Sequence, residues 1–160
     1  NPPGEDFPLD YTPAALERIW DLTGGQPFLV QLIAHRLVSR FNDLTFERGQ
    51  PPAPRFTEED VEAVITDAEF YTLGRYYFTG VWGQAEASPP RGQPAILAAL
   101  TEGALSTETV VTATGLSQEV ALAALKCLAA HDVVRERDGR WAFTVELMRR
   151  WVAARKAGQL

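Results

Sequence analysis

The sequence predicts a mainly α-helical fold, in which a helical subdomain precedes a helix-turn-helix unit with one β-hairpin. Apolar residues recur every three or four positions over most of the chain, as they do on the buried face of a helix. Ser, Thr and Pro stand at the expected helix starts, and Gly stands at several expected ends. One strong hairpin signal, Asp138-Gly139, separates two short strand-like segments.

Composition limits the class of protein. The chain has 160 residues, of which 46% are hydrophobic and 22% charged, as in globular domains. No apolar run approaches the roughly 18 residues of a membrane span, and no basic-then-apolar leader is present. The single cysteine, Cys127, has no partner for an internal disulfide, so we expect a cytoplasmic protein without membrane contact. The start at Asn1-Pro2-Pro3-Gly4 suggests a cut within a linker of a longer protein.

Charge is divided unevenly along the chain. Residues 1–91 carry 7 Lys/Arg against 14 Asp/Glu, whereas residues 92–160 carry 8 against 7. Nucleic-acid binding depends largely on neutralising phosphates, so the acidic first part does not favour it. The division also suggests two lobes.

The first lobe begins with two helices. Thr12 is placed to cap a helix that starts at Pro13, with Tyr11 and Leu16 as a hydrophobic staple. We expect Leu16, Ile19 and Trp20 to form its inward stripe. A second stripe runs to about Phe41 and consists of Phe28, Leu29, Leu32, Ile33 and Leu37.

A glycine-proline corner joins these helices at Thr23-Gly24-Gly25-Gln26-Pro27-Phe28. The glycines suit the positive φ of a helix end, and Pro27 suits a first helical turn, where its missing N–H costs nothing. Such a corner exposes backbone, so a flat ligand can approach closely.

The rest of the first lobe, residues 1–82, alternates irregular and helical segments. Residues 49–54 read as an exposed excursion. Thr57 caps the next helix, Phe56 and Val61 form a staple, and Ile65 and Ala68 are expected to face inward with Val61. An aromatic cluster, interpreted as a core seam between the lobes, comprises Phe70, Tyr71, Tyr76, Tyr77, Phe78 and Trp82. Residues 83–93 are predicted to be a linker or exposed loop.

Residues 94–160 follow the order of a winged helix-turn-helix. Pro94 opens a first helix, Ser106 caps a second that runs to about Thr114, and Ser117 caps a third. The hairpin pairs Val133–Arg137 with Arg140–Thr144, which places Val134 opposite Phe143 and Glu136 opposite Trp141. The inward residues of the closing helix are expected to be Leu147, Met148, Trp151 and Val152.

Winged helices often bind DNA, but fold alone does not establish that function. On the third helix Gln118 is placed to read adenine, whereas Glu119 opposes the phosphate field and Lys126 is the only basic residue. The wing offers three surface arginines as possible contacts, Arg135, Arg137 and Arg140. Surface arginines more often form a solvated face or a protein contact, so nucleic acid is not the favoured partner.

The sequence holds no convincing catalytic or metal-binding constellation. No G-x-x-x-x-G-K-[ST] loop is present, so the chain by itself lacks the phosphate machinery of an ATPase. Cys127 and His131 are four residues apart, but Cys127 among leucines reads as a buried, inert thiol, and His131 is placed to meet free carbonyls at a helix end. His35 reads as solvated. No third metal ligand is near, so we expect no metal site.

The whole chain resembles the C-terminal portion of the signal-transduction (STAND) NTPases, AAA-related switches of bacteria. The most specific segments are Leu22-Thr23-Gly24-Gly25-Gln26-Pro27-Phe28-Leu29-Val30-Gln31-Leu32, which is similar to the family's G-x-P lid motif, and Phe143-Thr144-Val145-Glu146-Leu147-Met148-Arg149-Arg150-Trp151. The resemblance implies a helical lid, a winged helix and a missing N-terminal P-loop core. It also implies that Gly25, Gln26 and Pro27 contact a nucleotide in the parent protein. Some relatives have a histidine just before the last helix, where Val145 or Glu146 stands here, so direct phosphate sensing by the winged helix is not favoured.

Two functions are therefore expected from different classes. The first is a regulatory lid and winged-helix fragment of a larger ATP-binding signalling ATPase, without cofactor of its own and with ATP or ADP and Mg in the parent, coupled to downstream effector or sensor domains. The alternative is a free-standing winged-helix transcription regulator that binds DNA.

Overall fold

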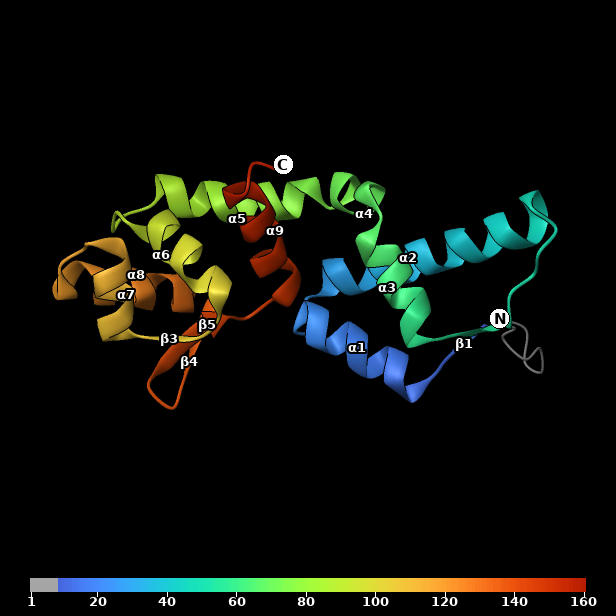
Figure 1. Cartoon of the computed structure of the whole chain (residues 1–160), viewed down its shortest axis with the longest axis horizontal. Helices are drawn as coiled ribbons and strands as arrows, with labels where there is room; N and C mark the ends of the chain where they lie inside the picture. Colours follow the sequence, from blue (N-terminus) through green and yellow to red (C-terminus); the bar gives the residue numbers. More distant parts are fainter. Residues whose placement is uncertain (1–8) are drawn as a thin grey trace. The chain divides into compact units, whose positions relative to one another are not determined.

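The computed structural model describes residues 9–160, and its chain is mainly helical with two small sheets (Figure 1). It divides into two compact units, one up to Arg75 and one from Tyr76 to Leu160. The expected boundary, a loop over residues 83–93, is wrong in detail. Residues 83–87 continue a helix, in which Ala85 is buried, and Gln93 already starts the next one. The burial of Ala85 offsets the poor helix propensity of Gly83.

In the first unit, a short parallel pair of strands, β1 (Asp10–Tyr11) and β2 (Arg55–Phe56), joins segments far apart in the sequence. The sequence patterns did not indicate this pair, because two residues are too short to alternate. The helices are α1 (Pro13–Thr23), α2 (Pro27–Asn42), α3 (Glu58–Thr66) and α4 (Ala68–Leu73). A π-helical turn (Asp43–Glu47) continues α2.

Two helix caps of the first unit, Thr12 and Thr57, are those that the sequence predicts. Thr12 accepts a hydrogen bond from the Ala15 N–H, and Thr57 forms a complete capping box with Asp60. Phe56 and Val61 are both buried, as expected of a staple. Ala68 is exposed, contrary to expectation, because α3 ends at Thr66 and extended Asp67 starts a new helix, so the stripe through Val61 and Ile65 does not continue.

The buried face of α1 differs from the expected one. The helix buries Ala15, Ile19, Leu22 and Thr23 and packs against α2 and α3, whereas Leu16 and Trp20 are exposed. Both stripes have helical spacing and share Ile19, so periodicity alone does not choose between them. The α2 stripe is confirmed at Leu29, Ile33 and Leu37, whereas Phe28 is exposed.

The second unit comprises five helices and one sheet within the described residues. The helices are α5 (Arg75–Ala87), α6 (Gln93–Ala99), α7 (Thr107–Thr114), α8 (Gln118–Ala130) and α9 (Glu146–Lys156), with a 3-10 turn (Leu100–Glu102) after α6. The strands are β3 (Leu105–Ser106), β4 (Val134–Arg137) and β5 (Arg140–Phe143), in the order β3-β5-β4.

The core of the second unit agrees closely with the expected one. Leu147, Met148, Trp151 and Val152 of α9 are buried, and α9 packs against α6. Of the expected aromatic residues, Phe70 and Tyr71 belong to the first unit, where their rings lie 5.3 Å apart at 88°. In the second unit the rings of Phe78 and Trp151 stack at 6.1 Å, and Trp82 tilts against Trp151. These rings anchor α5 on α9.

Candidate functional site

The glycine-proline corner has a closely specified backbone. Gly24 ends α1 in the left-handed region, with φ 59°, and its N–H donates to the Trp20 carbonyl over 2.8 Å. Gly25 follows with φ 78°. Thr23 is buried under the turn, and its hydroxyl donates to the Ile19 carbonyl and accepts from the Gly25 N–H. Two consecutive positive φ values explain why two glycines occur here.

Gln26 and Pro27 begin the second helix. The Gln26 side-chain oxygen accepts a hydrogen bond from the Leu29 N–H at 2.9 Å, so Gln26 is the N-cap of α2. Pro27 stands in the first turn and is exposed, as is Phe28. The three predicted contact residues therefore lie together at a bend that a ligand can reach from solvent. For Gln26, the capping bond is a structural role that the sequence analysis missed.

Trp20 belongs to the same surface, which sequence reasoning did not foresee. A Cβ atom added to Gly25 would lie 2.6 Å from atom Cζ3 of the Trp20 ring, so the ring covers the glycine closely. Trp20 is nevertheless 65% exposed, and Leu16 and Phe28 beside the corner in sequence are 55% and 43% exposed. We call Trp20, Gly25, Gln26, Pro27 and Phe28 the corner site. Its signal in the sequence was Gly25, because a glycine accepts a ring where a side chain would collide.

The hairpin carries the second predicted set of contacts. Asp138 and Gly139 have φ values of 53° and 75°, which form the turn that the Asp-Gly pair predicts. The register is as expected, with Val134 opposite Phe143 and Glu136 opposite Trp141. The Trp141 indole N–H donates to the Thr107 hydroxyl and fixes the hairpin against the start of α7.

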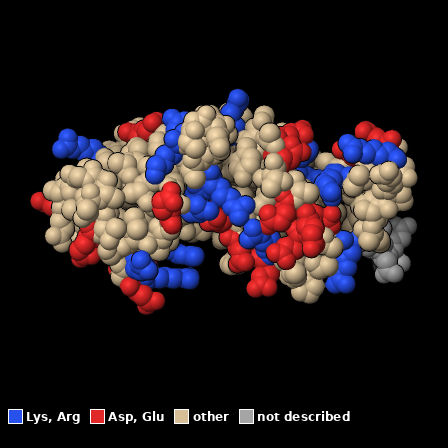
Figure 2. Space-filling model, viewed as in Figure 1, with Lys and Arg blue, Asp and Glu red and all other residues tan. Residues whose placement is uncertain are grey.

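Arg135, Arg137 and Arg140 are exposed on the hairpin, and Arg137 pairs directly with Arg140. No ion pair of these three residues occurs within residues 9–160. Figure 2 shows basic side chains at the hairpin tip, at the lower left, with acidic atoms beside them, whereas acidic side chains gather over α3. Like charges directly across a strand pair cost stability, so cross-strand pairing does not explain why Arg137 stands opposite Arg140.

A charged network fixes the start of α9. Arg149 forms two hydrogen bonds to the Glu146 carboxylate, and its Nη1 donates to the Thr101 carbonyl at 2.7 Å. Arg150 also reaches Glu146. Burial alone would raise the pKa of Glu146, but the hydrogen bonds and charges of the two arginines outweigh it and lower that pKa. The Glu146 hydrogen bond in turn raises the pKa of Arg149.

The remaining polar candidates show no catalytic arrangement. Cys127 is half-buried rather than buried, because α8 turns its thiol toward the Pro89 carbonyl, 3.8 Å away. The His131 ring does not meet helix carbonyls but contacts the Gln84 amide at 3.2 Å, while its backbone N–H caps α8. His35 is exposed, as expected. No cluster of potential metal ligands is found in the described part of the chain.

No helix between residues 9 and 160 combines the length and the apolar character that a bilayer crossing requires. Comparisons of the chain with protein families, curated proteins and solved structures find no match.

Proposed function

We propose that this chain is the regulatory lid and winged-helix portion of a larger ATP-binding signalling ATPase of the cytoplasm, in which the corner site contacts the base of a nucleotide. The observation that carries the proposal is the accessibility of the bend: Pro27 is exposed, as are Phe28, which follows it in the chain, and Trp20, whose ring lies against Gly25. Large exposed aromatic side chains beside bare glycine backbone are typical of a surface that receives a flat ligand.

The physical role of each group follows from this geometry. Gly24 adds no side chain at the bend, Gly25 leaves room for the Trp20 ring that lies against it, and the Gln26 cap fixes the direction of α2. The exposed ring of Trp20 offers a stacking face, and such stacking is worth roughly 1–3 kcal/mol per base in other proteins. The proposed core, which precedes Asn1 in the parent, supplies the contacts to the phosphates and to Mg.

The proposed output is conformational. Nucleotide held between the core and the corner site favours one arrangement of the lid, and the winged helix then docks on the core or is released to an effector. A nucleotide shifts this equilibrium only by its difference in affinity for the two arrangements. The charged network at Glu146 makes the α9 start a rigid attachment, since Arg149 ties it to the turn after α6.

The test is the ATP affinity of the full-length parent with Pro27→Ala. We expect weaker binding with an unchanged fold, because an exposed proline at a helix start contributes little packing. Pro13→Ala is the matched control, since Pro13 is also exposed and also stands in a first helical turn. Equal ATP affinity of the wild type and the Pro27 variant would contradict the proposal, as would an equal loss in both variants.

A transcription regulator is the second candidate, and one observation favours it. On the exposed arginine face of the hairpin, Arg137 stands opposite Arg140, so their two positive charges repel each other. A phosphate group bound between them would relieve this repulsion. On α8, however, the exposed start carries Glu119 beside Gln118, and Lys126 is its only basic residue. Phosphate contacts would thus come from the wing alone, which is why this function is the alternative.

A further inference from the structure

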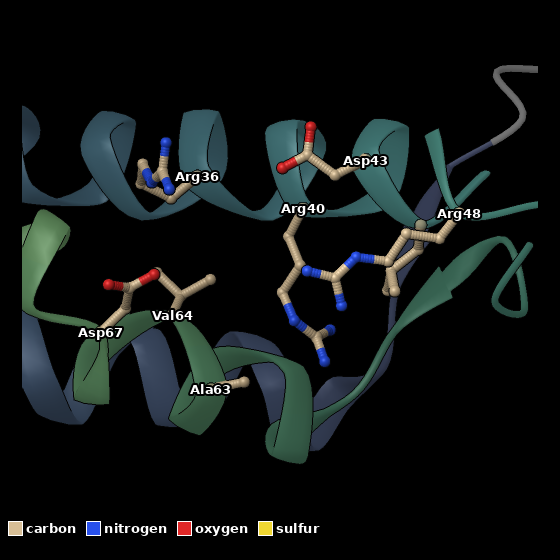
Figure 3. Close-up of a pocket in the computed structure, with 8 residues that line it drawn as sticks. Arg36, Arg40, Asp43, Arg48, Ala63, Val64 and Asp67 are labelled. Atoms are coloured by element: carbon tan, nitrogen blue, oxygen red, sulfur yellow. The ribbon is translucent and has the colours of Figure 1, made fainter. Parts of the chain in front are cut away.

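A polar pocket of about 230 Å³ lies in the first unit, among α2, the π-helical turn and α3. It shares no residue with the corner site. Three of its lining residues are arginines, Arg36, Arg40 and Arg48, and Figure 3 shows Arg40 and Arg48 extending into the space between α2 and α3. The other lining residues are Asp43, Leu44, Ala63, Val64 and Asp67.

Two of the arginines are held in place from outside the pocket. Arg36 Nη2 donates to Glu69 Oε2 and Arg40 Nη1 donates to Asp60 Oδ1, both at 2.8 Å. Neither carboxylate lines the pocket. Each bond uses one nitrogen of a guanidinium that carries several N–H donors, so both side chains are oriented and retain donors for a ligand.

Arg48, the third arginine of the pocket, is positioned differently from Arg36 and Arg40. It follows the π-helical turn, whose wide closing bond joins the Arg48 N–H to the Asp43 carbonyl at 3.1 Å. No ion pair of Arg48 is found in the part of the chain that the structure describes. π-helical turns cost stability and occur frequently at functional sites. Here the turn brings an uncompensated guanidinium to a pocket with two oriented ones.

The charge and size of the pocket limit its ligand. Three arginines and two aspartates are among the lining residues, so the lining is net positive although this half of the chain is acidic. The Asp67 carboxylate is already engaged, because it accepts a hydrogen bond from the Glu69 N–H at the start of α4. A volume of 230 Å³ is below the range of about 300–1,000 Å³ for drug-sized ligands, yet exceeds several waters at about 30 Å³ each.

We propose that this pocket binds a phosphate-type oxyanion through Arg36, Arg40 and Arg48. Planar guanidinium groups match the oxygens of phosphate in bidentate geometry, and three of them suit a dianion better than a single carboxylate. The volume admits inorganic phosphate or the phosphate end of a nucleotide, with the nucleoside left outside. The site is independent of the corner site and of the function proposed for it.

The test is calorimetric titration of the whole chain with sodium phosphate, against sodium chloride of equal ionic strength. We expect saturable binding to phosphate. Arg48→Gln should weaken it by about tenfold or more, the change that one charge-assisted hydrogen bond accounts for. Arg48→Lys should have a phosphate affinity between those of the wild type and Arg48→Gln, since lysine keeps the positive charge but lacks the paired N–H donors of the guanidinium group. Arg91→Gln, at an exposed arginine outside the pocket, should bind as the wild type does.

Parallel titrations with ADP identify the source of the oxyanion. Tighter binding of ADP than of phosphate, lost in Arg48→Gln, assigns the pocket to a nucleotide phosphate; equal affinities assign it to free phosphate. Saturable binding of neither ligand overturns the proposal. The proposal is also overturned if Arg48→Gln and Arg91→Gln weaken phosphate binding equally, because that result indicates a non-specific effect of the chain's charge. If ADP binding is lost in Pro27→Ala and kept in Arg48→Gln, ADP belongs to the corner site, and only the phosphate result then decides on the pocket.

Discussion

Substitution of Gly25 by alanine separates two constraints that act on the corner. The first is backbone conformation, since φ at Gly25 is 78°, and an L-residue in the left-handed region pays roughly 1–2 kcal/mol. The second is space, because the new Cβ would lie 2.6 Å from the Trp20 ring. The ring is largely exposed and can rotate away, at an expected cost of roughly 0.5–1.5 kcal/mol for leaving its rotamer.

Gly49 is the matched control, because it lies in the same unit and has φ 62°, but a Cβ there meets nothing within 4 Å. Gly49→Ala should therefore show the backbone cost alone, of about 1 kcal/mol. Gly25→Ala should cost about 0.5–1.5 kcal/mol more than Gly49→Ala. In a Trp20→Ala background this excess should vanish.

Urea denaturation followed by far-UV circular dichroism measures these differences without relying on Trp20 fluorescence. Both glycines report on the unfolding of the same unit, so their free energies are comparable. An equal cost at the two glycines, unaffected by Trp20→Ala, would refute the spatial constraint. If neither substitution destabilises the unit, the conformational reasoning itself fails.

Two further outcomes follow from the second unit. Glu146→Gln should lower the free energy of unfolding by about 1 kcal/mol near neutral pH. Because the folded pKa of Glu146 lies below its ordinary value of 4.5, this difference should be complete above pH 4.5 and shrink as the pH falls through the lowered pKa, as urea titrations across that range would measure. In anisotropy titrations near physiological salt, the chain should bind duplex DNA no more tightly than roughly 10⁻⁴ to 10⁻⁶ M; a nanomolar, sequence-selective complex weakened by Arg137→Ala would instead favour the transcription regulator.

The sequence predicted most of the second unit because its signals are local. Ser106 and Ser117 accept the hydrogen bonds of N-caps, and Asp138-Gly139 forms the turn that sets the hairpin register. Strand β3 was missed, since two residues beside a helix cap carry no alternation. Its pairing with β5 depends on a contact between segments far apart in the sequence.

In the first unit the residues of the corner could be predicted from the sequence, but the surface around them could not. Trp20 was assigned to the core because apolar spacing cannot distinguish the Leu16–Trp20 face from the Ala15–Leu22 face. The packing of α1 against α2 and α3, which buries Ala15, Ile19 and Leu22, decides it. The arginine pocket could not be predicted from the sequence either. It combines Arg36 and Arg40 of α2 with Arg48, which follows a π-helical turn, and no sequence signal predicts that turn.

Among the described residues, the strand order β3-β5-β4 leaves β4 at the edge of its sheet, with no further strand paired to its outer side. Edge strands invite other chains to add a strand, and charged side chains oppose this. Arg135, Glu136 and Arg137 place a charge at each of three successive positions of β4. We therefore expect these charges to oppose the addition of a strand, whether or not the hairpin contacts nucleic acid. An Arg137 variant that aggregates would have lost this protection, so light scattering belongs beside any binding measurement on the hairpin.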